Sequence, residues 1–115
     1  MHDDQSEALI ATLDAEFQPY VIYFVSAARR AGIPLMVISG RRNAPGNREV
    51  GGAERSLHLY GYAFDTQVQN RMRDQVPLQW WIALGRFWES MGGRWGGRFN
   101  PPDVNHFDAG YAVQI

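Results

Sequence analysis

Apolar residues near the start of the chain recur at the spacing of an amphipathic helix. The pattern is made by Leu9, Ile10, Leu13 and Phe17. It predicts a helix with one buried face, and Ser6, a good N-cap residue, is expected to begin it. Pro19 should break or restart this helix, and residues 19–32 then predict a second helix that ends at Gly32.

The middle of the chain has the pattern of two strands separated by a long loop. Residues 34–40, PLMVISG, form the continuous apolar run of a buried strand. Residues 41–56 are rich in Gly, Arg and Asn and predict a long loop. Residues 60–69 alternate and predict a strand with one aromatic face and one small or polar face. The aromatic face, which begins with Tyr60 and Tyr62, is expected to anchor this strand in the core.

The C-terminal part predicts one more helix and then short strands. Residues 77–92 have a proline in the first turn and a glycine at the end, as a helix often does. This order of elements indicates an α+β fold with a mostly antiparallel central sheet flanked by helices. We expect a single domain over residues 1–115, with an N-terminal helical part at 5–32 and a core at 33–115.

Composition and charge limit the classes of function. The chain has 115 residues, no cysteine and a formal net charge of −1. Without cysteine there is no disulfide and no thiol catalysis, so any metal must be held by histidine and carboxylate. The near-neutral charge gives no general attraction to nucleic acid. No apolar stretch reaches membrane-spanning length and the acidic N-terminus is unlike a signal peptide, so we expect synthesis in the cytoplasm and no membrane insertion.

The internal histidines, His58 and His106, are candidate metal ligands, and Asp65 is the natural third one. Zinc in a catalytic site usually takes three protein ligands of these types. His58 and Asp65 are seven residues apart, so a straight strand would point them to opposite faces, and Gly61 between them could supply the necessary bend. On spacing alone, hydrogen-bonded core or surface histidines are the commoner explanation, and both interpretations stay open.

Two longer motifs carry a resemblance to a known family. The stretch SLHLYGYAFD (Ser56–Asp65) resembles the Ser-x-His-x-x-Gly-x-Ala-x-Asp signature of zinc peptidoglycan peptidases, the D-Ala-D-Ala carboxypeptidases and L-alanyl-D-glutamate endopeptidases. WGGRFNPPDVNHFD (Trp95–Asp108) resembles the second signature of that family. SGRR (Ser39–Arg42) resembles the Ser-Gly-x-Arg that opens the family's active-site loop, and NREVGGAERS (47–56) is similar to the Gly-Gly stretch before its histidine signature. The resemblance covers residues 33–108 and implies the family's hedgehog-like peptidase fold, with 33–115 as the catalytic core.

The resemblance implies a metal centre and an acid/base. His58, Asp65 and His106 would hold one Zn²⁺ ion, and Asp103 would be the catalytic acid/base. Two neutral imidazoles and one carboxylate leave the ion with net positive charge, which suits activation of water. Asp103 lies three residues before His106, so a turn can bring its carboxylate to the reacting water. The alternative for Asp103, which follows two prolines, is a plain turn role.

Other site residues follow from the same resemblance. Arg42 would stabilise the carbonyl oxyanion or bind a substrate carboxylate, with Arg41 as the alternative arginine. Ser56 and Trp95 would bind substrate, although Ser56 could instead cap the loop. Asp108 stands where the family often has Glu or Gln, and is either a partner of a ligand imidazole or a neutral variation.

The leading hypothesis is a zinc metallopeptidase that cuts the stem peptide of peptidoglycan, as an L-alanyl-D-glutamate endopeptidase. The WGG…DxxHF block and the small size favour this activity, whereas the GGAERS stretch favours the alternative, a D-Ala-D-Ala carboxypeptidase. A phage-lysin-like protein of this kind would act at the cell wall after release, and a monomer is expected. The alternative of another class is a non-catalytic zinc-stabilised binding module or phage structural module.

Overall fold

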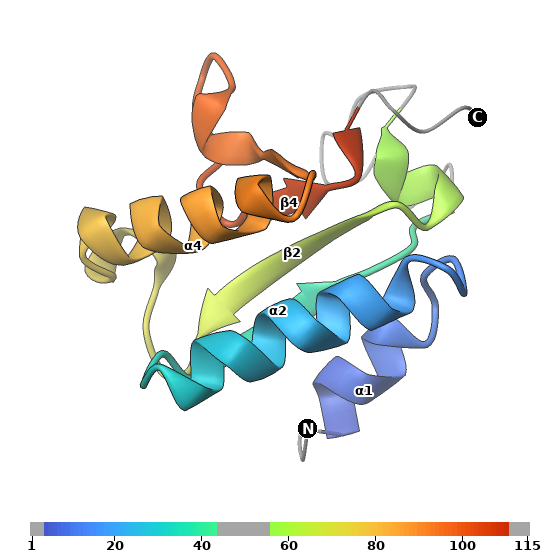
Figure 1. The fold of residues 1–115 in the computed structure, drawn as a ribbon, viewed down its shortest axis with the longest axis horizontal. Helices are drawn as coiled ribbons and strands as arrows, with labels where there is room; N and C mark the ends of the chain where they lie inside the picture. The colour runs from blue at the N-terminus through green and yellow to red at the C-terminus, as the bar shows by residue number, and fades with distance from the viewer. Residues whose placement is uncertain (1–3, 44–55, 111–115) are drawn as a thin grey trace.

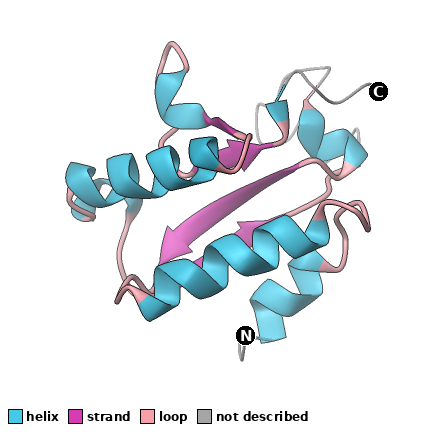
Figure 2. Cartoon of the chain, in the orientation of Figure 1, coloured by secondary structure: helices cyan, strands magenta, loops and turns pink. Residues whose placement is uncertain are grey.

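Helices and short strands alternate along the part of the chain that the computed structural model describes, residues 4–43 and 56–110 (Figure 1). The α-helices are α1 (Asp4–Ile10), α2 (Gln18–Arg30) and α4 (Leu78–Ser90). The strands are β1 (Leu35–Ser39), β2 (Ala63–Val68), β3 (Arg94–Trp95) and β4 (His106–Asp108). The 3₁₀ helices of this part of the chain are η1 (Leu57–Tyr60), η2 (Arg73–Gln75) and η3 (Gly96–Arg98) (Figure 2). Within these residues no helix has the length and apolar character needed to cross a membrane.

The strands form one antiparallel sheet in the order β1-β2-β4-β3. In the pairing of β2 with β4, Phe64 lies opposite Phe107 and Asp65 lies opposite His106. Because side chains alternate along a strand, one face of the sheet carries the aromatic pair and the other carries the polar pair. The predicted α+β class with an antiparallel sheet is confirmed.

Helices α2 and α4 cover the aromatic face of the sheet (Figure 1). The ring of Phe24 in α2 lies 4.9 Å from that of Phe107, and the ring of Trp88 in α4 lies 5.3 Å from that of Phe64. All four side chains are almost completely buried, and large rings of this kind contribute most of the apolar area in a small core. The helices therefore hold β2 and β4 in place from one side, while the polar side chains project from the other.

The first helix differs from the prediction. It ends at Ile10 and is followed by turns, whereas the apolar pattern was expected to continue as a helix to Phe17. Ser6 is not the N-cap, because the helix already includes Asp4. Instead Ser6 is fully buried and its Oγ accepts the backbone N–H of Val37 at 2.9 Å. Since β1 is an edge strand, this bond satisfies a backbone donor that the sheet leaves open.

Strand β2 begins later than predicted. It starts at Ala63 rather than Tyr60, because residues 57–60 form η1 and Gly61 takes a left-handed conformation with φ of 78°. Tyr60 is 42% exposed, so the prediction that it anchors the strand in the core is wrong. From Ala63 onward the predicted alternation is present, and Phe64 points into the core.

The remaining predicted elements agree with the structure. Helix α2 restarts the helical pattern with Pro19 near its first position and ends before Gly32, whose φ is 93°. Strand β1 lies within the predicted strand 34–40, and α4 lies within the predicted helix 77–92. Most of the predicted loop 41–56 falls outside the described residues.

Gly85 in the middle of α4 packs directly against the indole ring of Trp95. A Cβ at this position would lie only 2.1 Å from Cδ2 of that ring. Alanine normally favours a helix over glycine by about 1 kcal/mol, but here it would overpack the core. We therefore expect Gly85→Ala to lower the free energy of unfolding by about 1–3 kcal/mol, measured by urea unfolding with tryptophan fluorescence. Gln79→Ala, at an exposed position of the same helix, is the control and should change the free energy of unfolding by less than about 0.5 kcal/mol. An equally small effect of Gly85→Ala would contradict the prediction.

Candidate metal centre

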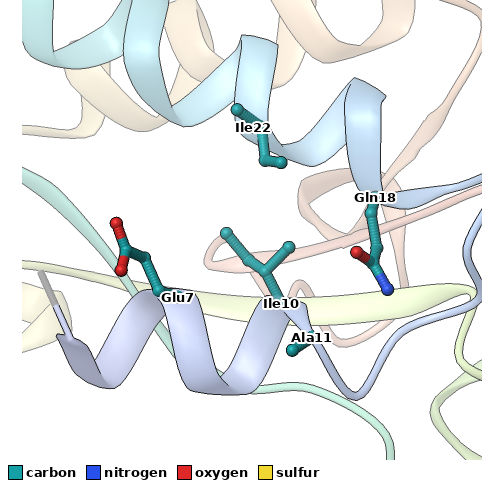
Figure 3. Close-up of a pocket in the computed structure, with 5 residues that line it drawn as sticks. All are labelled: Glu7, Ile10, Ala11, Gln18 and Ile22. Atoms are coloured by element: carbon teal, nitrogen blue, oxygen red, sulfur yellow. The ribbon is translucent and has the colours of Figure 1, made fainter. Parts of the chain in front are cut away.

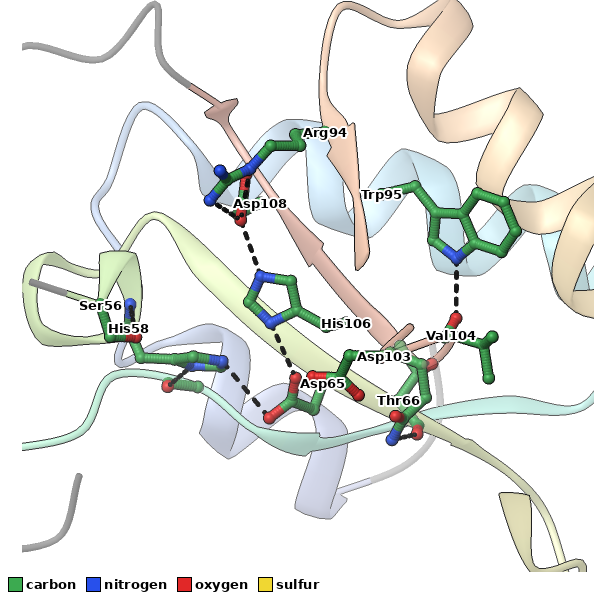
Figure 4. Close-up of polar contacts among 12 residues, drawn as sticks. Ser56, His58, Asp65, Thr66, Arg94, Trp95, Asp103, Val104, His106 and Asp108 are labelled. Carbon is green, nitrogen blue, oxygen red and sulfur yellow. Dashed lines mark hydrogen bonds and ion pairs between the residues drawn. The ribbon is translucent and has the colours of Figure 1, made fainter. Parts of the chain in front are cut away.

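Three side chains with metal-binding atoms converge on the polar face of the sheet (Figure 4). His58 comes from η1, Asp65 from β2 and His106 from β4. One ligand atom from each residue lies within 4.8 Å of the other two. Nε2 of His58 is 3.3 Å from Oδ2 of Asp65, and Nδ1 of His106 is 3.2 Å from Oδ1 of the same carboxylate. This geometry could hold one metal ion.

Strand register and one bend bring these residues together. Asp65 and His106 are neighbours because they are paired across β2 and β4. His58 reaches them because η1 ends at Gly61, whose left-handed conformation turns the chain into β2. Ser56 begins η1, and its Oγ accepts the N–H of His58 at 3.2 Å. The seven-residue spacing of His58 and Asp65 is thus compatible with one site, through the bend that the sequence predicted at Gly61.

His58 is held in the orientation and tautomer of a metal ligand. Its ring is 1% exposed, and its Nδ1 lies 2.9 Å from the carbonyl oxygen of Gly40. That contact requires the proton on Nδ1, which leaves Nε2 with a lone pair. Nε2 is buried and has no hydrogen-bond partner in the described part of the chain. A buried nitrogen without a partner, next to two further ligand atoms, is what a bound metal ion would satisfy.

The ring of His106 is held by a carboxylate on the side away from the metal cluster. Its Nε2 lies 2.7 Å from Oδ2 of Asp108, which is fully buried, while its Nδ1 faces Asp65. Metal-binding histidines commonly donate their second N–H to a carboxylate in this way. The sequence left Asp108 either as a partner of a ligand imidazole or as a neutral variation, and the structure places it in direct contact with the ring of His106.

The charges in the cluster are arranged for a cation. Burial works against the charged form of Asp65, but its close contacts with the His106 and His58 rings hold the pKa of Asp65 well below its usual range. Burial also opposes protonation of His106, but its hydrogen bonds to Asp108 and Asp65 and their negative charge raise the pKa of His106 to about 9. The metal-free ring is therefore protonated on both nitrogens at pH 7, and a metal ion held by Nδ1 would replace the proton there. The residues present fit a divalent cation.

Asp103 lies on the turn that leads into β4. Its carbonyl accepts the N–H of His106 at 3.1 Å, and its own N–H donates to the carbonyl of Gly96 at 2.8 Å. Its carboxylate Oδ1 accepts from Nη1 of Arg73 at 3.1 Å, on a partly exposed surface. The backbone thus ties Asp103 to a candidate ligand, while its carboxylate is not among the clustered ligand atoms. No sequence motif pointed to Arg73.

Trp95 does not have the placement predicted for a substrate-binding residue. It is 4% exposed, belongs to the hydrophobic core and donates its indole N–H to the carbonyl of Val104 at 2.8 Å. The structure therefore corrects the prediction, because a buried ring whose N–H is already bonded offers little to a substrate. Trp95 instead supports the segment between Asp103 and His106 from the core side.

The two neighbouring arginines have different surroundings. Arg41 donates from Nη2 to the carbonyl of Tyr60 at 3.0 Å, so its guanidinium fastens η1. Arg42 donates its backbone N–H to the carbonyl of His58 at 3.0 Å. Its Nε is buried and has no hydrogen-bond partner among the described residues. Arg42 therefore has a buried guanidinium donor left for a ligand, whereas one donor of Arg41 is used on the backbone of η1.

A separate groove lies between α1 and α2 (Figure 3). It has a volume of about 340 Å³ and is lined by Glu7, Ile10, Ala11, Gln18 and Ile22. A mostly apolar lining with one carboxylate provides neither a metal-binding set nor a nucleophile. The groove shares no residue with the metal cluster.

Comparisons with known proteins agree with this geometry. A family model described as Peptidase M15 matches residues 5–81, a range that includes His58 and Asp65. The solved structure of the L-Ala D-Glu endopeptidase ChiX from Serratia marcescens is similar, with 25% sequence identity, a TM-score of 0.66, and coverage of 91% of this chain and 86% of that chain. A mutant of the vancomycin resistance D,D-pentapeptidase VanY from a VanB-type resistance cassette, solved in complex with Zn(II), has the same fold at 16% identity, with a TM-score of 0.66 and coverage of 87% and 74%. No curated protein matches the sequence significantly.

Proposed function

The chain belongs to the peptidase M15 family, and from this premise we propose that it is a zinc metallopeptidase that hydrolyses the stem peptide of bacterial peptidoglycan. The observation that carries the proposal is the cluster of His58, Asp65 and His106, in which a buried imidazole nitrogen has no partner of its own in the described chain. The similarity to ChiX, an L-Ala D-Glu endopeptidase, supports the choice of substrate.

We assign the metal ligands by atom. Nε2 of His58, the carboxylate of Asp65 and Nδ1 of His106 would hold the ion, which matches the three-ligand sets of catalytic zinc. When bound, zinc supplies a Lewis acid that polarises a carbonyl and lowers the pKa of a coordinated water toward about 7. The VanY structure, solved with Zn(II), supports zinc as the ion. Gly40 and Asp108 hold the two imidazoles in the required orientation.

Asp103 is the proposed general base and acid. Its pair with Arg73 uses Oδ1, so Oδ2 is the oxygen that we assign to proton transfer. This oxygen would accept the proton of the attacking water and deliver it to the departing amine nitrogen. The hydrogen bond from the backbone N–H of His106 to the carbonyl of Asp103 supports this role, because it fixes the backbone of Asp103 relative to a metal ligand.

Arg42 is the proposed electrostatic group for the substrate. A guanidinium whose buried Nε has no partner among the described residues is suited to a carbonyl oxyanion or a substrate carboxylate. A substrate contact of Ser56 stays a prediction, since its Oγ already accepts the N–H of His58. Action at the cell wall after lysin-like release, as a monomer, is also part of the proposal.

We favour L-alanyl-D-glutamate endopeptidase activity over D-Ala-D-Ala carboxypeptidase activity. The ChiX match has higher sequence identity and covers more of both chains than the VanY match. The GGAERS stretch, which favours the carboxypeptidase, lies almost entirely outside the described residues.

Digestion of purified peptidoglycan tests the function and the bond that is cut. With zinc, the protein should release stem-peptide fragments that begin with D-glutamate, identified by mass spectrometry, and a chelator should stop their release until zinc is restored. Free D-alanine in place of these fragments would identify the carboxypeptidase instead. If the zinc-loaded protein binds the wall and releases neither product, the binding-module hypothesis replaces the enzymatic one.

A further inference from the structure

A line of charged and polar side chains crosses the sheet on the face of the metal centre (Figure 4). The register places Arg94 of β3 opposite Asp108 of β4, and His106 of β4 opposite Asp65 of β2. His106 and Asp108 are two residues apart on one strand, so their side chains share a face. Each member contacts the next, from Arg94 through Asp108 and His106 to Asp65.

The contact between Arg94 and Asp108 fixes both carboxylate oxygens. Nε of Arg94 lies 2.9 Å from Oδ1 and 3.1 Å from Oδ2, and its Nη2 lies 2.7 Å from Oδ2. The N–H of Gly110 also donates to Oδ1 at 2.8 Å. The Asp108 side chain is fully buried, and a buried carboxylate needs such charge-assisted bonds to stay in place. The fork of Arg94 therefore determines which way the carboxylate faces.

The same arginine is linked to the ligand imidazole through a second residue, Phe99. The guanidinium of Arg94 lies over the ring of Phe99, 4.8 Å from its centroid. The ring of Phe99 is in turn 5.4 Å from that of His106. Arg94 is thus linked to His106 by two routes, one through Asp108 and one through the ring of Phe99.

We propose that Arg94 is a positioning residue for the metal ligand His106 and that it acts mainly through Asp108. By holding Oδ2 of Asp108 2.7 Å from Nε2 of His106, it keeps the proton on Nε2 and the lone pair of Nδ1 directed at the ion. This inference rests on the metal centre of the proposed function and adds the residue that orients it from a third strand.

The test is the zinc affinity of Arg94→Met, measured by competition with a chromophoric chelator. Loss of such an indirect partner commonly weakens metal binding 10–100-fold, and we expect the dissociation constant for zinc to rise by about that factor. Arg98→Met is the matched control. Arg98 forms two hydrogen bonds of 3.0 Å with Glu89 and lies over the Trp95 ring, so its guanidinium is engaged away from Asp108. The dissociation constant of Arg98→Met for zinc should differ from that of the wild-type protein by less than about twofold, because surface substitutions generally have small effects.

A double substitution shows whether Arg94 acts through Asp108. Asp108→Asn alone should also weaken zinc binding about 10–100-fold. If the effect of Arg94 passes through that carboxylate, adding Arg94→Met to Asp108→Asn should change the dissociation constant by less than about twofold. If the double variant bound zinc a further 10–100-fold more weakly than Asp108→Asn alone, Arg94 would not act through Asp108.

Zinc affinity separates this inference from the proposed function. If the wild-type protein binds zinc and Arg94→Met binds it equally well, the role of Arg94 is refuted while the metal centre stands. If the wild-type protein binds no zinc, the metal centre itself is refuted. Should Arg94→Met not fold, Arg94→Lys decides: a point charge cannot hold both oxygens as the fork does, so we expect about 3–10-fold weaker binding, and unchanged affinity would overturn the proposal.

Discussion

Asp65→Asn is expected to weaken zinc binding by more than about 100-fold and to abolish peptidase activity. Changes in residues that only support a ligand cost 10–100-fold, and Asp65 is a proposed ligand itself. Its two oxygens lie 3.2 and 3.3 Å from the two imidazoles. Asparagine keeps the shape of the side chain but removes the one negative charge among the three ligands. Zinc content after desalting and chelator competition measure the affinity, and release of stem-peptide fragments measures the activity.

Asp14→Asn is the matched control for this prediction. It makes the same isosteric change at a carboxylate that accepts the N–H of Glu16 at 3.0 Å and is not in the metal cluster. We expect wild-type zinc affinity and activity from this variant. If Asp65→Asn bound zinc as tightly as Asp14→Asn, the three residues would not be the zinc site, and the assignment of His58 and His106 would fail with it.

The metal cluster was accessible from the sequence because it depends on residue type and on one local bend. The chain has no cysteine and only two internal histidines, which limits the possible ligands. The odd spacing between His58 and Asp65 required a turn, and Gly61 can adopt the left-handed conformation that the structure has there. The same bend explains why the prediction for Tyr60 is wrong. It ends η1 before the strand begins, so Tyr60 lies outside the strand and is exposed.

The residues that support the cluster could not be predicted, because strand register and turn geometry bring them in. Arg94 meets Asp108 only through the pairing of β3 with β4, and Arg73 meets Asp103 across thirty positions of sequence.

Ser6 shows a local ambiguity of another kind. A serine that caps a helix and a serine that bonds a neighbouring strand both satisfy a backbone N–H, so the pattern alone cannot separate them.

Trp95 shows the limit of a motif. It lies in the stretch that resembles a family signature, but the aromatic core determines its position, against Gly85 and below the turn at Val104. A motif residue can therefore serve the active site by supporting it from the core, and sequence alone does not distinguish this from contact with substrate.

Asp103→Asn is expected to lower kcat about 10²–10⁴-fold while zinc binding and stability stay near wild type. General acid/base groups contribute rate enhancements of this size, and the amide cannot take the proton. Asp103 is not among the clustered ligand atoms, so the ion should be retained. Its pair with Arg73 is exposed, with side chains 44% and 59% accessible, and such pairs contribute at most about 1 kcal/mol. Steady-state cleavage of isolated stem peptides gives kcat, and chelator competition gives the zinc affinity.

Asp74→Asn, on the exposed η2 turn beside Arg73, is the matched control and should keep wild-type kcat. The comparison also separates the enzyme from a zinc-stabilised binding module. In an enzyme, Asp65→Asn loses zinc and activity together, whereas Asp103→Asn loses activity alone. A protein that needs zinc only for folding would show no activity for Asp103→Asn to lose. If Asp103→Asn keeps wild-type kcat in a zinc-dependent peptidase, another group carries the proton, and the assignment of Asp103 is wrong.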